Sequence, residues 1–377
     1  MTTTQEMTVE YCRTPINNEW DTFVNEMNGE IFQTSVWANI GTSNNTHRII
    51  IKKDNEIVAG CQFKVRHYPV IGNIGYIEQG PCIKYHGPLL YEMVVREIKR
   101  ATSANRLLYM VIDLHYNLGN LVPCLEKNGF VRKDSSLPPN PIVKSTLLLS
   151  LDQPLETILS QMKKERRKNI NKGLRSPIEH QLGCRDDIKT FFELMLATCE
   201  RRKTKPLINN IETFYKIWDA LSPMGWIVMH LAKVEGRIIC AAIGLTAGQT
   251  YRSVYWGWNG EFADYNISDT IGWFAIRWAK EQGFNYYDFV HLDPLSADAI
   301  ASEAPIPEYV KTRTHFGSTF YKMQFGGYVV HYPGLYCIFS NKLKYYLVHV
   351  VGCKLIQLKP TRLLVRKIQL QMKRVSQ

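Results

Sequence analysis

Residues 227–246 read IVMHLAKVEGRIICAAIGLT, and this stretch decides the fold class. Two runs of apolar and β-branched residues flank a Glu-Gly pair at 235–236, which predicts two strands joined by a tight turn. Downstream, a helix is predicted from the capping residue Ser268 to Gly283, and FNYYDFV at 284–290 predicts a buried strand. A hairpin, a helix and a strand in this order are typical of an α/β domain with a mixed sheet.

The same order of elements occurs earlier in the chain. Residues 47–66 predict a hairpin, residues 87–104 a helix, and residues 107–114 a buried strand that ends near Asp113. The two hairpins, and likewise the two helices, begin about 180 residues apart, a spacing that predicts a duplicated domain. We therefore expect two α/β domains with mixed sheets flanked by helices.

A proline-rich stretch, LPPNP at 137–141, lies between the two halves and is typical of a boundary. We expect a first domain at 1–142, a second at 143–340, and a separate C-terminal segment at 341–377. In the second half, residues 154–173 predict one helix, whose KKERRKNINKG segment carries six basic residues and one acidic residue.

The chain has 377 residues and a formal net charge of +12, and all of the excess lies at one end. Residues 309–377 contain 12 lysines and arginines and no acidic residue, so the rest of the chain is neutral. A neutral body with a basic end predicts a polyanionic partner, such as RNA, a phosphorylated substrate or an anionic membrane face. The alternative is a solubilising tail, although such tails are usually plainly polar and this one is also apolar.

Several classes of protein are disfavoured. No apolar run reaches the ~18–20 residues that span a bilayer, and the N-terminal MTTTQEMTVEY lacks the basic start and apolar core of a secretory signal. Nine scattered cysteines without a CxxC pair argue against a disulfide framework or a cysteine zinc site. We therefore expect a cytoplasmic protein without a metal. The sequence also lacks the GxSxG motif of serine hydrolases and the HExxH motif of zinc proteases.

Five short motifs occur in order between about residues 20 and 335. They are QTSVWA at 33–38, GP at 80–81, TLLLSL at 146–151 with RKNINK at 167–172, YYDF at 286–289 and GSTFYKMQFGG at 317–327. Together they resemble the motifs of the Fem family of tRNA-dependent aminoacyltransferases, the non-ribosomal peptidyltransferases that build peptidoglycan cross-bridges. The resemblance implies two tandem GNAT-like (acetyltransferase-like) domains, and since no long heptad segment occurs, no coiled-coil arm.

The resemblance also implies a reaction. An amino acid would pass from aminoacyl-tRNA to an amine acceptor, preferably a phosphorylated or lipid-linked peptidoglycan precursor. Because the ester of the donor is already activated, positioning and oxyanion stabilisation suffice, and no cofactor is implied.

Three other functions stay open. Gly41 stands where many members that bind a UDP-linked muropeptide have a lysine, which leaves room for a small amine acceptor in a natural-product pathway. An acyl-CoA-dependent N-acyltransferase is less favoured, because residues 262–267 lack the glycine-rich loop that holds the CoA pyrophosphate at a helix N-terminus. A non-catalytic RNA- or membrane-binding protein is hard to reconcile with paired domains.

Three residues form the predicted catalytic group. By resemblance, Lys322 takes the place of the family's FK lysine, where a cation attracts phosphate and favours an oxyanion; on residue type alone it would be a solvated lysine on an edge strand. Tyr321 beside it is a candidate to stack or hydrogen-bond near the terminal adenosine. Asp288 ends a predicted strand and is a candidate to accept a proton or orient the amine, with a structural hydrogen bond as its alternative.

Four residues are predicted to bind the acceptor substrate. Arg201 resembles the family arginine that contacts the acceptor's diphosphate, and a guanidinium suits phosphate. Tyr255 matches a tyrosine that lines the acceptor cleft, and Trp256 and Trp37 belong to matching motifs. For the aromatic residues the alternative is core packing, and for Arg201 it is a favourable place at the end of a helix.

Basic residues are predicted to meet polyanions. Arg167, Lys168 and Lys172 could steer the tRNA backbone, or form a solvated helix face. The segment 341–377 mixes basic and apolar residues, which predicts contact with the anionic inner face of a membrane or with tRNA phosphates.

Overall fold

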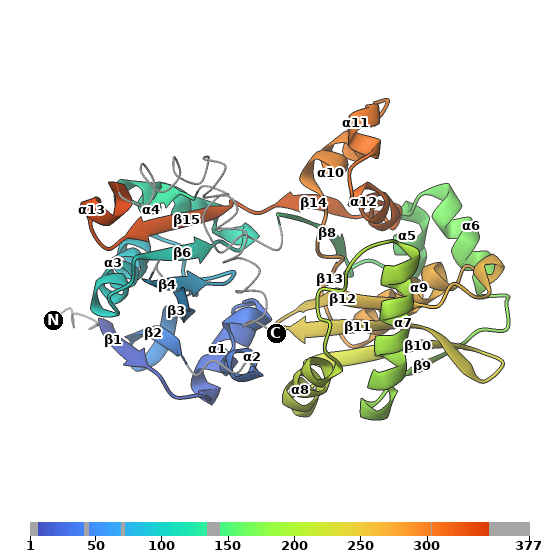
Figure 1. Cartoon of the computed structure of the whole chain (residues 1–377), viewed down its shortest axis with the longest axis horizontal. Helices are drawn as coiled ribbons and strands as arrows, with labels where there is room; N and C mark the ends of the chain where they lie inside the picture. Colours follow the sequence, from blue (N-terminus) through green and yellow to red (C-terminus); the bar gives the residue numbers. More distant parts are fainter. Residues whose placement is uncertain (1–6, 41–44, 69–71, 134–143, 303, 347–377) are drawn as a thin grey trace. The chain divides into compact units, whose positions relative to one another are not determined.

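The computed structural model describes residues 7–40, 45–68, 72–133, 144–302 and 304–346 (Figure 1). Contacts between residues divide the chain into two units. The first unit is residues 1–141 with 333–377, and the second is residues 142–332. Each unit is built on one mixed sheet flanked by helices, so the predicted α/β class is confirmed.

The sheet of the first unit has the strand order β1-β2-β3-β4-β6-β15-β7, with β5 beside β3. β4 and β6 run parallel, and the neighbouring pairs run antiparallel. The strands are β1 Met7–Cys12, β2 Thr46–Lys53, β3 Glu56–Tyr68, β4 Gly72–Ile77, β5 Cys82–Ile83, β6 Tyr109–Asp113, β7 Val131–Arg132 and β15 Leu335–Phe339. The helices are α1 Asn18–Glu26, α2 Ser35–Ile40, α3 Pro88–Ala104, α4 Val122–Lys127 and α13 Lys342–Tyr345. Leu90, Val94 and Ile98 of α3 are buried against this sheet, because they recur at helical spacing on one face.

The sheet of the second unit has the order β14-β8-β13-β12-β11-β10-β9. Its one parallel pair among the described residues is β12 with β13. The strands are β8 Ser145–Ser150, β9 Glu179–Leu182, β10 Ile227–Val234, β11 Arg237–Ala247, β12 Thr250–Trp258, β13 Tyr286–Asp288 and β14 Tyr328–His331. The helices are α5 Leu155–Gln161, α6 Lys164–Gly173, α7 Ile188–Arg201, α8 Ile211–Leu221, α9 Ile267–Glu281, α10 Pro294–Ala301, α11 Glu308–Lys311 and α12 Phe316–Met323.

The two sheets repeat one plan, as the spacing of motifs predicts. Reading from one edge, β1-β2-β3-β4-β6 of the first sheet corresponds to β9-β10-β11-β12-β13 of the second. The predicted hairpins are β2-β3 and β10-β11, and the predicted helices are α3 and α9. In each sheet the parallel pair lies at the same place, next to the second strand of the hairpin.

One strand in the first sheet comes from the far end of the sequence. β15 pairs with β6 on one side and β7 on the other, and its Leu335, Tyr336 and Cys337 are buried. The expected second domain, 143–340, is therefore wrong at its end, because the second unit stops at Tyr332. Short apolar strands of this kind carry no local signal for which sheet they complete.

Two further expectations need correction. The single helix expected over 154–173 is two helices, because the chain turns extended at Met162 and Lys163. The expected cap of the next helix, Ser268, lies inside it, and Asn266 is the residue before its first turn. Asn266 adopts a left-handed conformation, with φ of 54°, which asparagine tolerates better than most residues.

The two units should differ in their ability to fold alone. The fragment 142–332 holds every strand of its own sheet, so we expect a cooperative unfolding transition in urea. The fragment 1–141 lacks β15, which leaves backbone groups of β6 and β7 unpaired, so we expect it to be unfolded or aggregated. Far-UV circular dichroism and urea titration measure both.

The control restores the missing strand. Arg132 pairs with Tyr336 in an antiparallel register, so residue 133 can be joined to residue 334 by a short linker. A chain of 1–133 joined in this way to 334–346 should regain cooperative unfolding. Cooperative unfolding of 1–141 by itself would contradict the role given to β15.

Candidate active site

The candidate site lies where β13 separates from β12. The two strands pair in parallel at three positions, and the last pair is Arg252 with Asp288. β13 ends there, while β12 continues to Trp258, past a register shift opposite Ile243 and Gly244. Strands that separate in this way open a fork at their carboxyl ends, which is where α/β sheets bind ligands.

The backbone beyond the fork is strained. Val290 and His291 have φ values of 39° and 50°, in the left-handed region that suits glycine. Each such residue costs on the order of 1–3 kcal/mol and persists only when its surroundings hold it. Asp288, which is buried, supplies one support by accepting hydrogen bonds from the backbone N–H of Val290 at 2.7 Å and from the hydroxyl of Thr146.

Lys322 supplies the second support. It lies on the helix α12, not on an edge strand, and its ammonium donates to the carbonyls of Val290 at 2.6 Å and His291 at 3.4 Å. Burial lowers the pKa of Lys322 to about 8, against the attraction of Asp288, and the positive charge of Arg202 lowers it further. At neutral pH this side chain is therefore a cation, held at the mouth of the fork.

Tyr321 is fixed at both ends. Its hydroxyl donates to the carbonyl of Ser268 in α9 at 2.8 Å, and its carbonyl accepts from Arg166 in α6 at 3.2 Å. Its ring lies edge-on to Phe325 at 5.5 Å between ring centroids. Burial raises the pKa of Tyr321 well above its usual value, so its hydroxyl stays protonated.

The residues predicted to bind the acceptor do not lie together in one site. Arg201 ends α7, where it donates to the carbonyl of Trp258 at 2.9 Å and stacks on that indole at 4.5 Å. Tyr255 contacts Phe214 of α8 edge-on at 5.1 Å, whereas the next residue, Trp256, packs with the apolar cluster under α9. Neighbouring residues of a strand point to opposite faces, so these two side chains do not line one surface.

Trp37 belongs to the first unit. It lies on α2, half-buried, with Phe32 edge-on at 5.1 Å. Gly41, which stands where many members of the family that the chain resembles have a lysine, lies outside the described residues.

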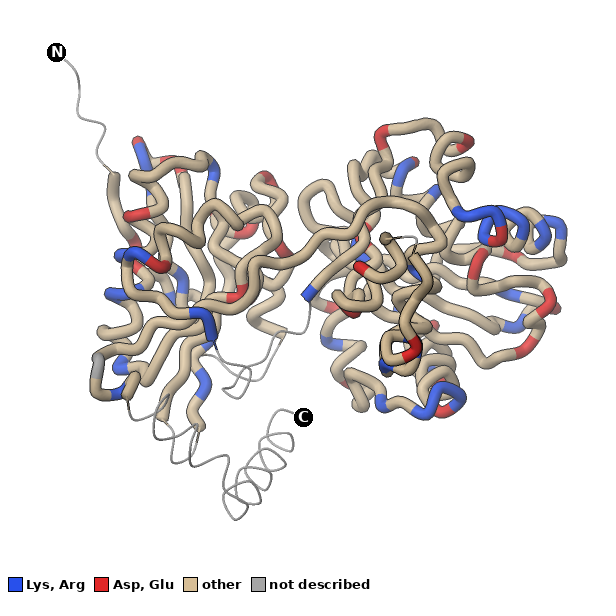
Figure 2. Tube along the Cα trace, turned by 90° about the horizontal axis from the view of Figure 1, so that it is seen from above, with Lys and Arg blue, Asp and Glu red and all other residues tan. Residues whose placement is uncertain are grey.

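The predicted tRNA-binding residues share α6 but differ in exposure. Arg167 donates to the carbonyls of Ser160 at 2.8 Å and of Met162, so it holds the break between α5 and α6. Lys168 and Lys172 are exposed and lie one turn apart on one face. Figure 2 shows basic residues gathered along this helix. The segment 347–377, which carries most of the basic tail, lies outside the described residues.

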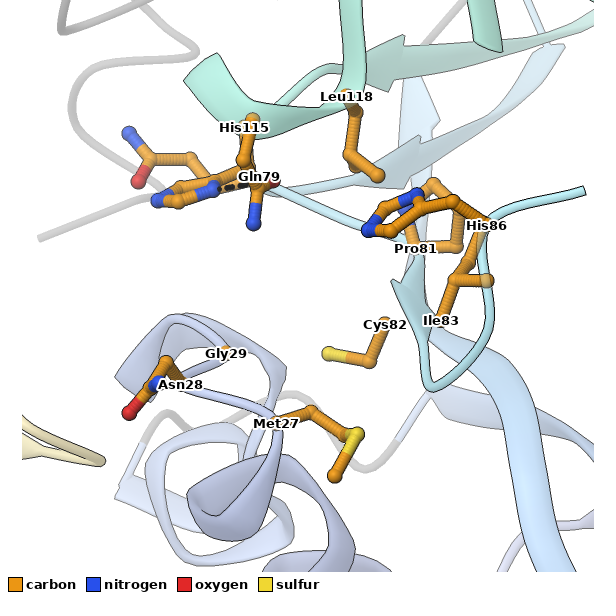
Figure 3. Close-up of a pocket in the computed structure, with 11 residues that line it drawn as sticks. Met27, Asn28, Gly29, Gln79, Pro81, Cys82, Ile83, His86, His115 and Leu118 are labelled. Atoms are coloured by element: carbon orange, nitrogen blue, oxygen red, sulfur yellow. Dashed lines mark hydrogen bonds between the residues drawn. The ribbon is translucent and has the colours of Figure 1, made fainter. Parts of the chain in front are cut away.

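A small pocket occupies the equivalent place in the first unit, near the ends of β4 and β6 (Figure 3). Gln79 and His115 line it, and Nε2 of the buried His115 lies 2.9 Å from Oε1 of Glu30. Burial, with the nearby carboxylates of Glu78 and Glu30, raises the pKa of Asp113 to about 7. The sequence predicts Asp113 as a strand end but not these two neighbours, which precede it by 35 residues (Glu78) and 83 residues (Glu30).

A hydrogen-bonded series elsewhere in the second unit resembles a hydrolase triad. His331 bonds through Nδ1 to the hydroxyl of Ser145 at 2.7 Å and through Nε2 to Asp298 at 2.9 Å. Ser145 is fully buried, so its hydroxyl cannot reach a substrate. The series fastens β14 to β8 and α10 and does not support a nucleophilic mechanism.

Neither a metal-ligand cluster nor a membrane-spanning helix occurs in the part of the chain that the structure describes. No three His, Cys, Asp or Glu residues there are grouped as a metal site requires. No helix there has the length and apolar character to cross a bilayer.

A mixed sheet whose parallel pair separates beyond an irregular strand, with a helix packed on it, defines the GNAT class. A family model described as the acetyltransferase (GNAT) domain matches residues 160–298, and the model of the FemAB family matches residues 15–120. The crystal structure of FemX superimposes with a TM-score of 0.76 at 20% identity, covering 90% of this chain and 99% of that one. L-PGS from Bacillus licheniformis shares the fold with a TM-score of 0.55 at 12% identity, covering 90% and 98%.

Curated relatives match part of the chain. The chain is 24% identical over 236 residues to the lipid II:glycine glycyltransferase of Staphylococcus haemolyticus, covering 59% of this chain and 55% of the relative. The same protein of Staphylococcus aureus matches at 24%, covering 59% and 54%. The chain thus spans about half the length of the curated relatives it matches. Part of its first half thus resembles the FemAB family in sequence, part of its second half resembles a GNAT domain, and the fold is that of FemX.

The glycines of the GSTFYKMQFGG motif should differ sharply in how well they tolerate substitution by alanine. Gly327 has φ of 87°, and an added Cβ would lie 2.4 Å from the carbonyl oxygen of Leu148. We expect Gly327→Ala to lower the free energy of unfolding by about 2–3 kcal/mol, because strain and overlap add. Gly317→Ala is the control: it lies in α12 with open space around it, so it should be neutral or stabilise by ~0.5–1 kcal/mol. Urea titration measures both, and equal effects would contradict this account of the motif.

Proposed function

We propose that this chain is an aminoacyltransferase that moves an amino acid from aminoacyl-tRNA to the amine of a peptidoglycan precursor. The observation that carries the proposal is the Lys322 ammonium, held beside Asp288 at the mouth of the β12–β13 fork. The names of the matched relatives, lipid II:glycine glycyltransferases, support a precursor of this class as acceptor.

The chemistry asks for a cation and for positioned substrates. A neutral amine attacks the ester carbonyl, a new N–C bond forms, and the C–O bond to the tRNA 3′ end breaks. In the tetrahedral intermediate between these two steps the carbonyl oxygen carries negative charge, and a fixed ammonium such as that of Lys322 stabilises this charge. The amine's proton ends on the leaving 3′ oxygen. Asp288 already accepts two hydrogen bonds, so we assign it to holding Lys322 and the strained loop and not to removing that proton.

The structure around α9 disfavours acyl-CoA as donor. In GNAT enzymes that use CoA, the N-terminus of this helix would carry the pyrophosphate. Here Asp269 lies in its first turn, buried and paired with Arg166. The last residue of α6, Gly173, lies so close that an added Cβ would be 2.2 Å from Thr270 and 2.6 Å from the carbonyl of Tyr265. An acid and a packed helix therefore occupy the place a pyrophosphate needs.

Partners and location follow as parts of the proposal. The exposed lysines of α6 suit the tRNA backbone. An acceptor anchored in a membrane would bring the chain to the inner membrane face as a peripheral, cytoplasmic protein, with the basic segment 341–377 as a suitable contact.

A direct assay tests the reaction. The full chain is incubated with radiolabelled aminoacyl-tRNA pools and, in separate arms, lipid II, a UDP-linked muropeptide, small amines and acetyl-CoA with each acceptor. Label transferred from tRNA to lipid II or the muropeptide is the expected result. Transfer to small amines alone would favour a natural-product pathway, and acetyl transfer without tRNA would overturn the proposal.

Removal of the Lys322 cation should abolish most of the transfer. We expect Lys322→Ala and Lys322→Met to lower the single-turnover rate about 10²–10³-fold with native circular dichroism, since an oxyanion stabiliser is worth ~3–4 kcal/mol. Because the pKa of Lys322 is lowered to about 8, the wild-type rate should fall as the pH rises through that value. Near-native turnover of either variant would sink the assignment.

The exposed face of α6 should contribute to tRNA affinity. We expect Lys168→Gln/Lys172→Gln to weaken tRNA binding and to make its salt dependence shallower, by about one unit of slope per lost phosphate contact. Binding is measured by filter retention across a salt series. The control is Lys189→Gln/Lys216→Gln, which removes the same charge from exposed positions on α7 and α8. An equal loss in the control would show that only net charge matters.

A further inference from the structure

A buried ion pair lies directly behind the predicted catalytic helix. Arg166, in α6, and Asp269, in the first turn of α9, are each 6% exposed and form a close ion pair. Neither residue belongs to the predicted site, and sequence spacing does not connect them. A guanidinium withdrawn from water is costly unless it is paired and hydrogen-bonded, so this arrangement needs a reason.

The guanidinium of Arg166 also contacts two rings, Tyr321 in α12 and Phe325 just after it. Its central carbon lies 4.2 Å from the ring centroid of Tyr321 and 4.5 Å from that of Phe325. These distances are within the range of cation–π attraction, which strengthens when the cation is desolvated. Lysine offers no planar group for such contacts, so the geometry is specific to arginine.

Arg166 also forms a hydrogen bond with the backbone of α12. Nη2 of Arg166 donates to the carbonyl of Tyr321 at 3.2 Å, and the hydroxyl of Tyr321 donates to the carbonyl of Ser268 at 2.8 Å. Both ends of Tyr321 are therefore fixed, one to α6 and the other to α9. The next residue is Lys322, whose ammonium reaches the carbonyl of Val290 at 2.6 Å.

We infer that Arg166, held by Asp269, is a positioning residue that sets the direction in which Lys322 presents its ammonium to the reacting ester. It acts through Tyr321 and touches no substrate. The inference rests on the proposed function, because it gives Arg166 a role only if Lys322 stabilises the reaction. A displacement of about 1 Å in a catalytic group can cost on the order of 10²-fold in rate, so a support of this kind has a measurable effect.

The test is a double-mutant cycle on the single-turnover rate. Arg166→Lys keeps the charge and the partner Asp269 but loses the planar contacts and the fixed hydrogen bond. We expect it to lower the rate at saturating substrates about tenfold or more, with KM for both substrates nearly unchanged. In a Lys322→Ala background the same substitution should have almost no further effect on the rate, because the group that it positions is gone.

Stability is measured in parallel to separate positioning from folding. A merely structural role predicts that Arg166→Lys lowers the rate by the same factor with and without Lys322, in proportion to the loss of unfolding free energy. Arg277→Lys is the matched control, since Arg277 pairs with Glu281 on the exposed face of α9, and it should leave the rate unchanged.

The outcomes distinguish the two hypotheses. If Lys322→Ala has near-native activity, the proposed function fails whatever Arg166 does. If Lys322→Ala is impaired but Arg166→Lys is not, or the two effects on the rate are additive, the proposed function stands and the positioning role of Arg166 is overturned.

Discussion

The structure of the second unit depends on the backbone conformation of the turn that follows β13. Parallel pairing with β12 stops at Asp288, and the backbone then passes through left-handed conformations at Val290 and His291, whose side chains do not favour them. The turn must therefore be held from outside, and Lys322 does so by donating to both carbonyls. A cation is fixed at the end of the strand because the backbone needs a donor there, and the proposed acyl transfer calls for a cation in the same place.

That requirement extends to the rest of the unit. Lys322 is in place only because α12 is, and α12 leads into β14 through Gly326 and Gly327, both left-handed, with Gly327 against the carbonyl of Leu148 in β8. β8 in turn carries Thr146, which donates to Asp288. The fork is thus built from segments far apart in the sequence that meet through the strands of one sheet. This explains why the recognisable motifs are short, widely spaced and rich in glycine.

The sequence predicted what local pattern controls and missed what distant contacts control. The hairpins at 46–68 and 227–247 and the helices α3 and α9 follow from alternation, turn residues and helical spacing, and the duplication followed from them. The pairing of β15 with the first sheet could not be predicted, because a five-residue apolar strand can pair with the unpaired strands of either sheet. The break at Met162 was missed since no proline or glycine marks it. Arg166 was hidden among the basic residues of α6, where only its partner Asp269, about 100 residues away, separates it from its solvated neighbours.

One ion pair connects the choice of donor with the geometry of the site. In a CoA-binding GNAT domain the first turn of the helix equivalent to α9 is an anion site, left open by a glycine-rich loop. Here Asp269 lies in that turn and pairs with Arg166 of α6, so a buried ion pair fills the place where a CoA-binding domain receives an anion. Because the same guanidinium also contacts Tyr321, the pair that fills this turn also anchors α12. The pair therefore agrees with the proposed donor, an ester that is already activated and that calls for a fixed cation and not for a pyrophosphate site.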